Sequence, residues 1–169
     1  MIQKNSTNNI VLIGMPGCGK TTTGELLAKL QNYKFIDTDQ LIVEKTGKSP
    51  RQVVEEYGRD YFLAIQDEVV LSIKQSNCII STGGGIVHSD AAMRYLKSIG
   101  FVLFLDTNYD IIEERMDASR KLVRANGTLL ELYNERRPLY CKYADATIDC
   151  NTVDLQLLCN RILELRDNA

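Results

Sequence analysis

The chain has 169 residues, a formal net charge of −2 at pH 7 and 25% charged residues. This length suits one domain with a three-layer core, the charge gives no basic field for nucleic acid, and no apolar run approaches the roughly 20 residues of a membrane span. The five cysteines contain no C-x-x-C pair and the first residues are polar. We therefore expect free thiols in a reducing cytoplasm and a single monomeric domain over 1–169, without nucleic-acid or membrane partners.

Short apolar runs alternate with amphipathic segments, which favours an α/β fold with helices flanking a mainly parallel sheet. The apolar runs predict strands at Ile10–Ile13, Lys34–Asp37, Cys78–Ser81, Phe101–Leu105 and Thr147–Asp149. Periodicity, caps and stops predict helices from Lys20 to Leu30, from Ser49 to Gly58, through Val69 to Ile73, from Ser89 to Gly100, from Tyr109 to Met116 and from Val153 to Leu165.

The first strand runs into Gly14-Met15-Pro16-Gly17-Cys18-Gly19-Lys20-Thr21, which matches the phosphate-binding pattern G-x-x-x-x-G-K-T. Glycines let backbone N–H groups turn onto phosphate oxygens, and the following helix N-terminus adds a fixed partial positive charge. The Lys20 ammonium supplies a mobile full charge, and the Thr21 hydroxyl is a hard Mg²⁺ ligand. We therefore expect a nucleoside triphosphate to bind at Gly17, Cys18, Gly19, Lys20, Thr21 and Thr22.

Polar and glycine residues also follow the second and third predicted strands. Asp37 and Asp39 lie at a carboxyl end, where open α/β folds bind ligands, and a continued strand would point both side chains the same way. One carboxylate could hold the metal through water while the other orients a hydroxyl proton; the alternative is a turn that caps the next helix. Gly83, Gly84 and Gly85 allow a ligand to approach closely, or else form a merely permissive loop.

Three arginines lie downstream of the phosphate loop: Arg115 near a helix end, Arg120 within the weakly periodic stretch 118–127, and Arg136. Phosphoryl transfer requires in-line positioning and cations over the transferring group, often on a lid that closes. A single exposed arginine is most often a solvated charge. Three of them after a phosphate loop favour a kinase whose mobile lid includes 118–127.

The phosphate loop, Phe35-Ile36-Asp37-Thr38-Asp39, Ile80-Ser81-Thr82-Gly83-Gly84-Gly85 and Arg136-Arg137-Pro138-Leu139-Tyr140 together resemble the motifs of the shikimate kinase family, from Gly14 to about Asn151. The resemblance implies a nucleoside-monophosphate-kinase-like, three-layer P-loop fold with a five-stranded parallel sheet. It also implies substrate-binding helices over about 38–62 and a lid over about 117–128. The implied reaction is Mg²⁺-dependent transfer of the γ-phosphate of ATP to shikimate, giving shikimate 3-phosphate in aromatic amino acid biosynthesis.

On the nucleotide side, the resemblance implies that Lys20 and Thr21 serve the phosphates and the metal, and that Asp37 helps to hold Mg²⁺. Arg115 would stack on adenine and Arg120 would be the lid arginine. The family's R-P-L-L lid sequence reads Arg120-Lys121-Leu122-Val123 here. Arg124 is therefore an alternative lid arginine.

On the acceptor side, the resemblance implies that Asp39 contacts the reacting hydroxyl, that Gly83–Gly85 line the substrate site and that Arg136 holds the substrate carboxylate. With Lys20 and Arg120, Asp39 would complete the catalytic set. The family usually reads G-E-x-x-F-R-x-x-E, in which the arginine grips that carboxylate and the glutamate braces it. Here these positions are Leu63 and Gln66, so both charges vanish together. The joint loss is coherent, because a buried carboxylate without its cation is costly.

Three hypotheses stay open after this departure. Shikimate is the leading acceptor, with Arg59, one helical turn before Leu63, as a partial substitute for the missing arginine. The second hypothesis is a kinase of the same fold acting on a different small polyol or hydroxy acid. The third is a catalytically weak nucleotide-binding regulator, against which Lys20, Thr21, Asp37 and the other retained site residues argue.

Overall fold

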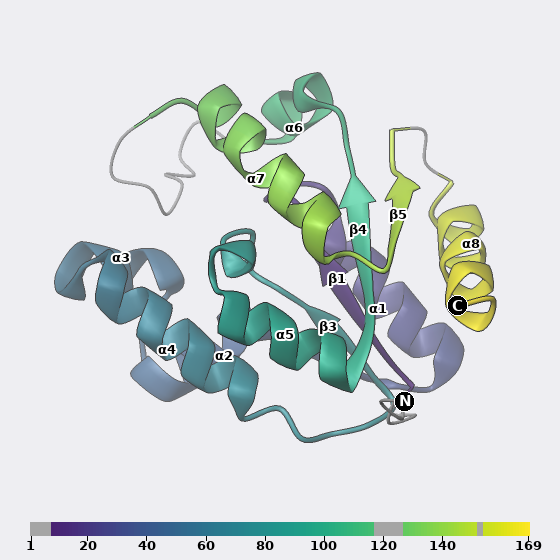
Figure 1. Ribbon diagram of the computed structural model, residues 1–169, viewed down its shortest axis with the longest axis horizontal. Helices are drawn as coiled ribbons and strands as arrows, with labels where there is room; N and C mark the ends of the chain where they lie inside the picture. Colours follow the sequence, from purple (N-terminus) through teal and green to yellow (C-terminus); the bar gives the residue numbers. More distant parts are fainter. Residues whose placement is uncertain (1–7, 117–126, 152–153) are drawn as a thin grey trace.

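The computed structural model describes residues 8–116, 127–151 and 154–169, and within them one five-stranded sheet forms the centre of the molecule (Figure 1). Its strands are β1 (Asn9–Ile13), β2 (Lys34–Asp37), β3 (Cys78–Ser81), β4 (Gly100–Asp106) and β5 (Ala146–Asp149). They are all parallel, in the order β2-β3-β1-β4-β5. Every residue of β1 and β3 is buried, as expected for parallel strands that are covered on both faces. The predicted five-stranded parallel sheet is confirmed.

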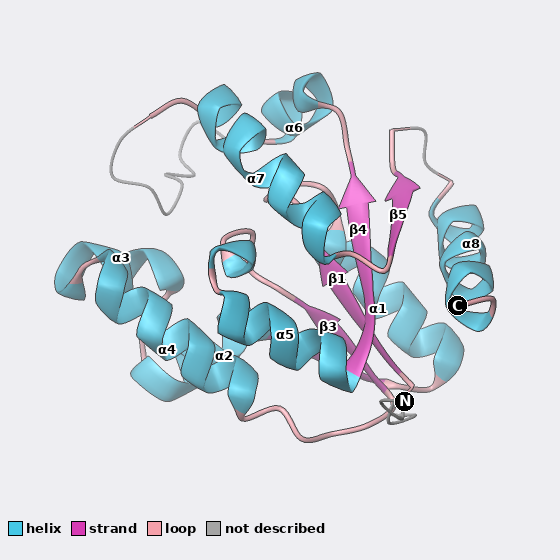
Figure 2. Cartoon of the chain, viewed as in Figure 1, coloured by secondary structure: helices cyan, strands magenta, loops and turns pink. Residues whose placement is uncertain are grey.

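Helices cover both faces of the sheet and make the three layers (Figures 1 and 2). They are α1 (Lys20–Gln31), α2 (Thr38–Thr46), α3 (Pro50–Tyr57), α4 (Arg59–Leu71), α5 (Asp90–Ile99), α6 (Tyr109–Arg115), α7 (Leu129–Tyr143) and α8 (Leu155–Asp167), with a short 3₁₀ turn η1 (Ile86–His88). The pair α1 and α8 packs on one face, and α5 and α7 pack on the other. Among the described residues, no helix is long and apolar enough to cross a membrane.

The helices α2, α3 and α4 form a group beside the sheet with a small core of its own (Figure 1). The buried residues of this core are Ile42, Val53, Phe62, Ile65 and Val69. Fully burying a side chain of this size contributes roughly 1.5–3 kcal/mol. These contacts hold α4, which begins within the predicted substrate-binding segment 38–62, in a fixed place.

Two helices were not predicted from the periodicity, although the first of them, α2, lies within the substrate-binding helices over about 38–62 that the resemblance implies. The helix α2 begins directly after β2, because the Asp37 side chain accepts the backbone N–H groups of Asp39 and Gln40. The helix α7 contains Pro138, a residue that normally breaks a helix, and it starts with a capping box between Thr128 and Glu131. The helix predicted from Val153 instead begins at Leu155, after the cap residue Asp154.

Candidate active site

The phosphate loop connects β1 to α1 through glycines whose backbone conformations other residues rarely adopt. Gly19 has φ 94° and is the last residue before α1, a left-handed conformation that glycine adopts without steric cost. The side chain of Lys20 is 8% exposed, and its Nζ donates to the carbonyl oxygens of Gly14 and Met15 at 2.8 and 2.9 Å. The loop thus holds its lysine at the N-terminus of α1, where anions are favoured.

A cavity of about 700 Å³ lies over this loop, and we call it the nucleotide cavity because the predicted nucleotide residues line it. Its lining includes the predicted nucleotide, metal and acceptor residues Gly17, Cys18, Gly19, Lys20, Thr21, Thr22, Asp37, Asp39, Gly83, Gly84 and Arg115. Ser81, Cys150 and Leu158, which the sequence did not point to, line it as well. The carboxyl ends of neighbouring strands therefore bring the separate motifs to one place.

The two aspartates differ in their surroundings. Asp37 ends β2, and its Oδ1 accepts the N–H of Asp39 at 2.8 Å, so the capping alternative is borne out for this residue. Asp39 lies in the first turn of α2, so the expected strand alternation does not apply to it. The pKa of Asp39 is raised to about 6, mainly by burial and in part by the Asp37 charge, while the Lys20 charge lowers it. A carboxyl with this pKa changes its charge close to neutral pH.

The triple-glycine loop lies against both Asp39 and Arg136. A Cβ at Gly83 would lie 2.7 Å from Oδ1 of Asp39, and a Cβ at Gly84 would lie 3.1 Å from Nη1 of Arg136. Side chains on the loop would displace the two functional groups. The Tyr140 hydroxyl, from α7, donates to the carbonyl oxygen of Gly84 at 2.6 Å and fixes the loop.

A second cavity, of about 100 Å³, lies on the other side of this loop. It shares Pro16, Asp39, Gly83 and Gly84 with the first cavity, so the two meet at Asp39. Its remaining lining is Pro50, Arg59, Phe62, Leu63, Gln66, Gly85, His88 and Arg136. Arg59 therefore lines the same cavity as Leu63. We call this second cavity the acceptor cavity.

The cationic end of the acceptor cavity is built by α4 and α7. Arg136 is 5% exposed, and its pKa is lowered, mainly by burial and in part by the charge of Arg59. The side chain of His88 is 16% exposed, its Nε2 lies 3.7 Å from Oε1 of Glu135, and the residue lines this cavity. No motif in the sequence marks it as a site residue.

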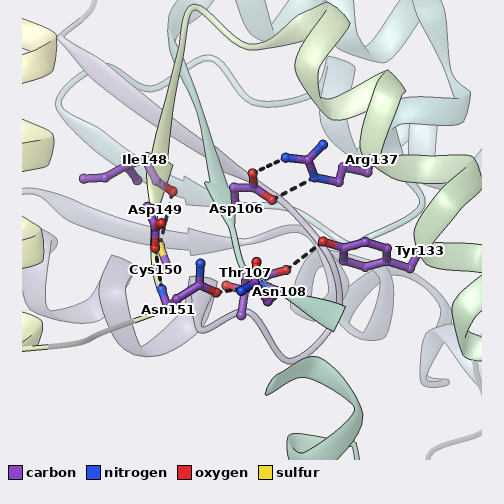
Figure 3. A network of polar contacts seen from close by, with 9 residues as sticks. All are labelled: Asp106, Thr107, Asn108, Tyr133, Arg137, Ile148, Asp149, Cys150 and Asn151. Carbon is purple, nitrogen blue, oxygen red and sulfur yellow. Dashed lines mark hydrogen bonds and ion pairs between the residues drawn. The ribbon is translucent and has the colours of Figure 1, made fainter. Parts of the chain in front are cut away.

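A polar network anchors α7 to the carboxyl end of β4 (Figure 3). Arg137 makes a two-pronged ion pair with Asp106, with Nη2 to Oδ2 at 2.6 Å and Nε to Oδ1 at 3.2 Å. The hydroxyl of Tyr133 donates to the carbonyl oxygen of Thr107 at 3.2 Å. Bidentate pairs of this kind fix orientation. These contacts fix α7 in place. Arg136, which precedes Arg137 on this helix, lines the acceptor cavity.

Of the predicted arginines outside the acceptor cavity, the structure describes Arg115 alone. The Arg115 guanidinium donates to the carbonyl oxygen of Gly17 at 3.3 Å, at the rim of the nucleotide cavity. Arg120 and Arg124 lie outside the described residues, as does the predicted lid over 117–128 except for its last two positions.

A phosphate loop alone is common to hydrolases, switches and kinases. An acceptor cavity that opens at the phosphate end of the nucleotide cavity, with an acid where the two meet, is the arrangement that a kinase requires, because the attacking hydroxyl must lie in line with the terminal phosphate. The fold and the site therefore define a P-loop kinase of small molecules.

Comparisons with known proteins narrow this class. The shikimate kinase family model matches residues 16–166. A shikimate kinase of Clostridium botulinum (strain Eklund 17B) is 44% identical over 138 residues, which cover 80% of this chain and 83% of that protein. Shikimate kinase from Acinetobacter baumannii, solved in complex with shikimate, superposes with a TM-score of 0.85 and 30% identity, covering 95% and 93% of the two chains. Shikimate kinase from Aquifex aeolicus superposes with a TM-score of 0.82 and 31% identity, and the match covers 95% of this chain and 96% of that one. The chain belongs to the shikimate kinase family.

Proposed function

We propose that this chain transfers the γ-phosphate of ATP to a ring hydroxyl of shikimate in the cytoplasm, as a monomer. The observation that carries the proposal is the meeting of the two cavities at Asp39. ATP fits the larger cavity, with its phosphates on the loop, and a small hydroxy acid fits the smaller one. Family membership and a relative solved with shikimate support this choice of acceptor.

On the nucleotide side, backbone N–H groups of Gly17–Thr22 and the Lys20 ammonium hold the phosphates. The Thr21 hydroxyl and the Asp37 carboxylate both line the nucleotide cavity, and hard oxygen donors of this kind fit Mg²⁺. When bound, Mg²⁺ would neutralise charge on the β- and γ-phosphates. Arg115, at the cavity rim, stacks on adenine.

On the acceptor side, Asp39 accepts the proton of the attacking hydroxyl or aligns it. Its pKa of about 6 keeps it ionised at neutral pH while leaving it a stronger base than an exposed aspartate. Gly83, Gly84 and Gly85 let the ring approach the loop, and Arg136 pairs with the carboxylate. Arg120 completes the cationic set over the transferring phosphate.

A second acceptor is favoured by one observation. Leu63 lines the acceptor cavity with an apolar side chain where the family usually carries an arginine. A different small hydroxy acid or polyol would suit a cavity with fewer cations. The two candidates differ in the acceptor and share the ATP chemistry.

The test is an ADP-release assay over shikimate, quinate, gluconate and homoserine. We expect the highest kcat/KM with shikimate, and no release above background from Lys20→Ala with any acceptor. A higher kcat/KM with gluconate or homoserine would overturn the assignment of shikimate and leave a kinase. No acceptor-dependent release at all would overturn the kinase proposal.

A further inference from the structure

Two residues that line the acceptor cavity each carry a buried nitrogen donor that has no hydrogen-bond partner among the described residues. Gln66, on α4, is 1% exposed, and its Nε2 is unpaired. Arg136, on α7, is 5% exposed, and its Nε is unpaired. Buried donors without partners are unfavourable, and nearly all are satisfied in native proteins. Because both side chains line the same cavity, a ligand with acceptor oxygens would satisfy them together.

The charges around the acceptor cavity indicate what kind of ligand this is. Arg59, Gln66 and Arg136 line only the acceptor cavity, whereas Asp39 also lines the nucleotide cavity. Among the described residues that line the acceptor cavity, Asp39 is the one carboxylate. The part remote from the nucleotide therefore carries two guanidinium groups and an amide. Glu135, whose charge acts on Arg136, lies against His88 and does not line the cavity. An anionic group on the ligand would balance the guanidinium charges.

We propose that the side-chain amide of Gln66 donates a hydrogen bond to the carboxylate of the acceptor, beside the guanidinium of Arg136, and thereby selects an anionic acceptor. This inference rests on the proposed function and assigns a specificity-determining residue to it. In the family, a glutamate at this position supports the arginine at position 63. In this chain, Gln66 instead binds the acceptor directly.

Leu63 explains why position 66 carries a neutral amide and not a carboxylate. With Leu63 on the same helix, a carboxylate at position 66 would share the cavity with the guanidinium groups of Arg59 and Arg136. Its charge would compete with the carboxylate of the acceptor for these cations and repel it. A glutamine of the same length donates to the ligand and leaves Arg136 available.

The test compares shikimate with its primary amide, which has the same shape and no charge, in wild type, Gln66→Met and Gln66→Glu. A hydrogen bond to a charged group is worth more than one to a neutral group. We expect kcat/KM for shikimate to fall about tenfold to a hundredfold in Gln66→Met, through KM, and the amide to lose less than about tenfold. In Gln66→Glu the preference should reverse toward the amide. The KM for ATP should stay unchanged in both variants.

Gln156→Glu is the matched control, because Gln156 is exposed on α8 and lines neither cavity. It should leave all constants as in wild type. An equal loss for shikimate and its amide in Gln66→Met would show a merely structural role and overturn the inference. If Gln66→Glu does not fold, Gln66→Met decides alone. Failure of the wild type to phosphorylate shikimate would instead refute the proposed function.

Discussion

Replacing Asp39 by asparagine should strongly lower the turnover number and stabilise the fold. The pKa of Asp39 is about 6 in the folded protein, against 3.8 for an ordinary aspartate. For an acid whose pKa is raised by folding, the folded state binds the proton more tightly than the unfolded state. The ionised carboxylate therefore does not change the free energy of unfolding below pH 4. It lowers that free energy by a growing amount between pH 4 and 6 and by a constant amount above pH 6. At about 1.4 kcal/mol per pKa unit, that amount is about 3 kcal/mol at pH 7 and about half of it at pH 5.

Asparagine carries no charge at either pH and has nearly the same shape. Urea unfolding of Asp39→Asn should thus give a free energy of unfolding about 2–3 kcal/mol above wild type at pH 7, and a smaller gain at pH 5. The turnover number should fall at least about a hundredfold with little change in ATP affinity. Asp167→Asn is the control: it lies at the exposed end of α8, where it pairs with Arg166, and should change the free energy of unfolding by less than about 1 kcal/mol and leave the turnover number unchanged. A loss of stability at pH 7, or the same gain at both pH values, would refute the reasoning.

The same pKa predicts that kcat/KM of the wild type falls toward acid pH with a midpoint near 6; a flat quenched-flow profile from pH 5 to 8 would contradict this. Lys20→Ala should retain less than about a tenth of the activity in the ADP-release assay, since the residue serves the phosphates, and should lower the free energy of unfolding by about 1–3 kcal/mol through the lost bonds to Gly14 and Met15 while the domain still folds; retention of more activity would exclude that role. Gly84→Ala should raise the KM for shikimate, because the new Cβ would lie 2.7 Å from Pro16 and 3.1 Å from the Arg136 guanidinium; unchanged acceptor kinetics would show that the loop yields. Leu63→Arg with Gln66→Glu should lower the KM for shikimate about tenfold to a hundredfold, and Leu63→Arg alone should do less; a higher KM in the double variant would favour another acceptor.

The centre of the sheet was predictable because β1, β3 and β4 are buried apolar runs with turn residues at their ends. The phosphate loop was predictable because its spacing is tied to backbone chemistry. The position of Asp39 was not, because the side chain of Asp37 starts a helix where the alternation assumed a strand. The helix α7 was hidden by Pro138, although the pattern Thr128-x-x-Glu131 marks its start.

The composition of the acceptor cavity depends on long-range packing. Arg59 and Gln66 on α4 meet Arg136 on α7 only because the α2–α4 group packs beside the sheet. No local pattern links residues so far apart in the sequence. The motif comparison did identify Leu63 and Gln66 as departures. Only the structure showed that the amide nitrogen of Gln66 is buried and unpaired.

The central claim is that the two cavities place shikimate in line with the terminal phosphate of ATP. ³¹P NMR of the wild type with ATP and shikimate tests it most directly, because it detects the product itself. We predict a new phosphomonoester signal that grows as the γ-phosphate signal of ATP declines, and no such signal with Asp39→Asn. Release of inorganic phosphate without a phosphomonoester would contradict the claim, since ATP would then be hydrolysed and not used to phosphorylate shikimate.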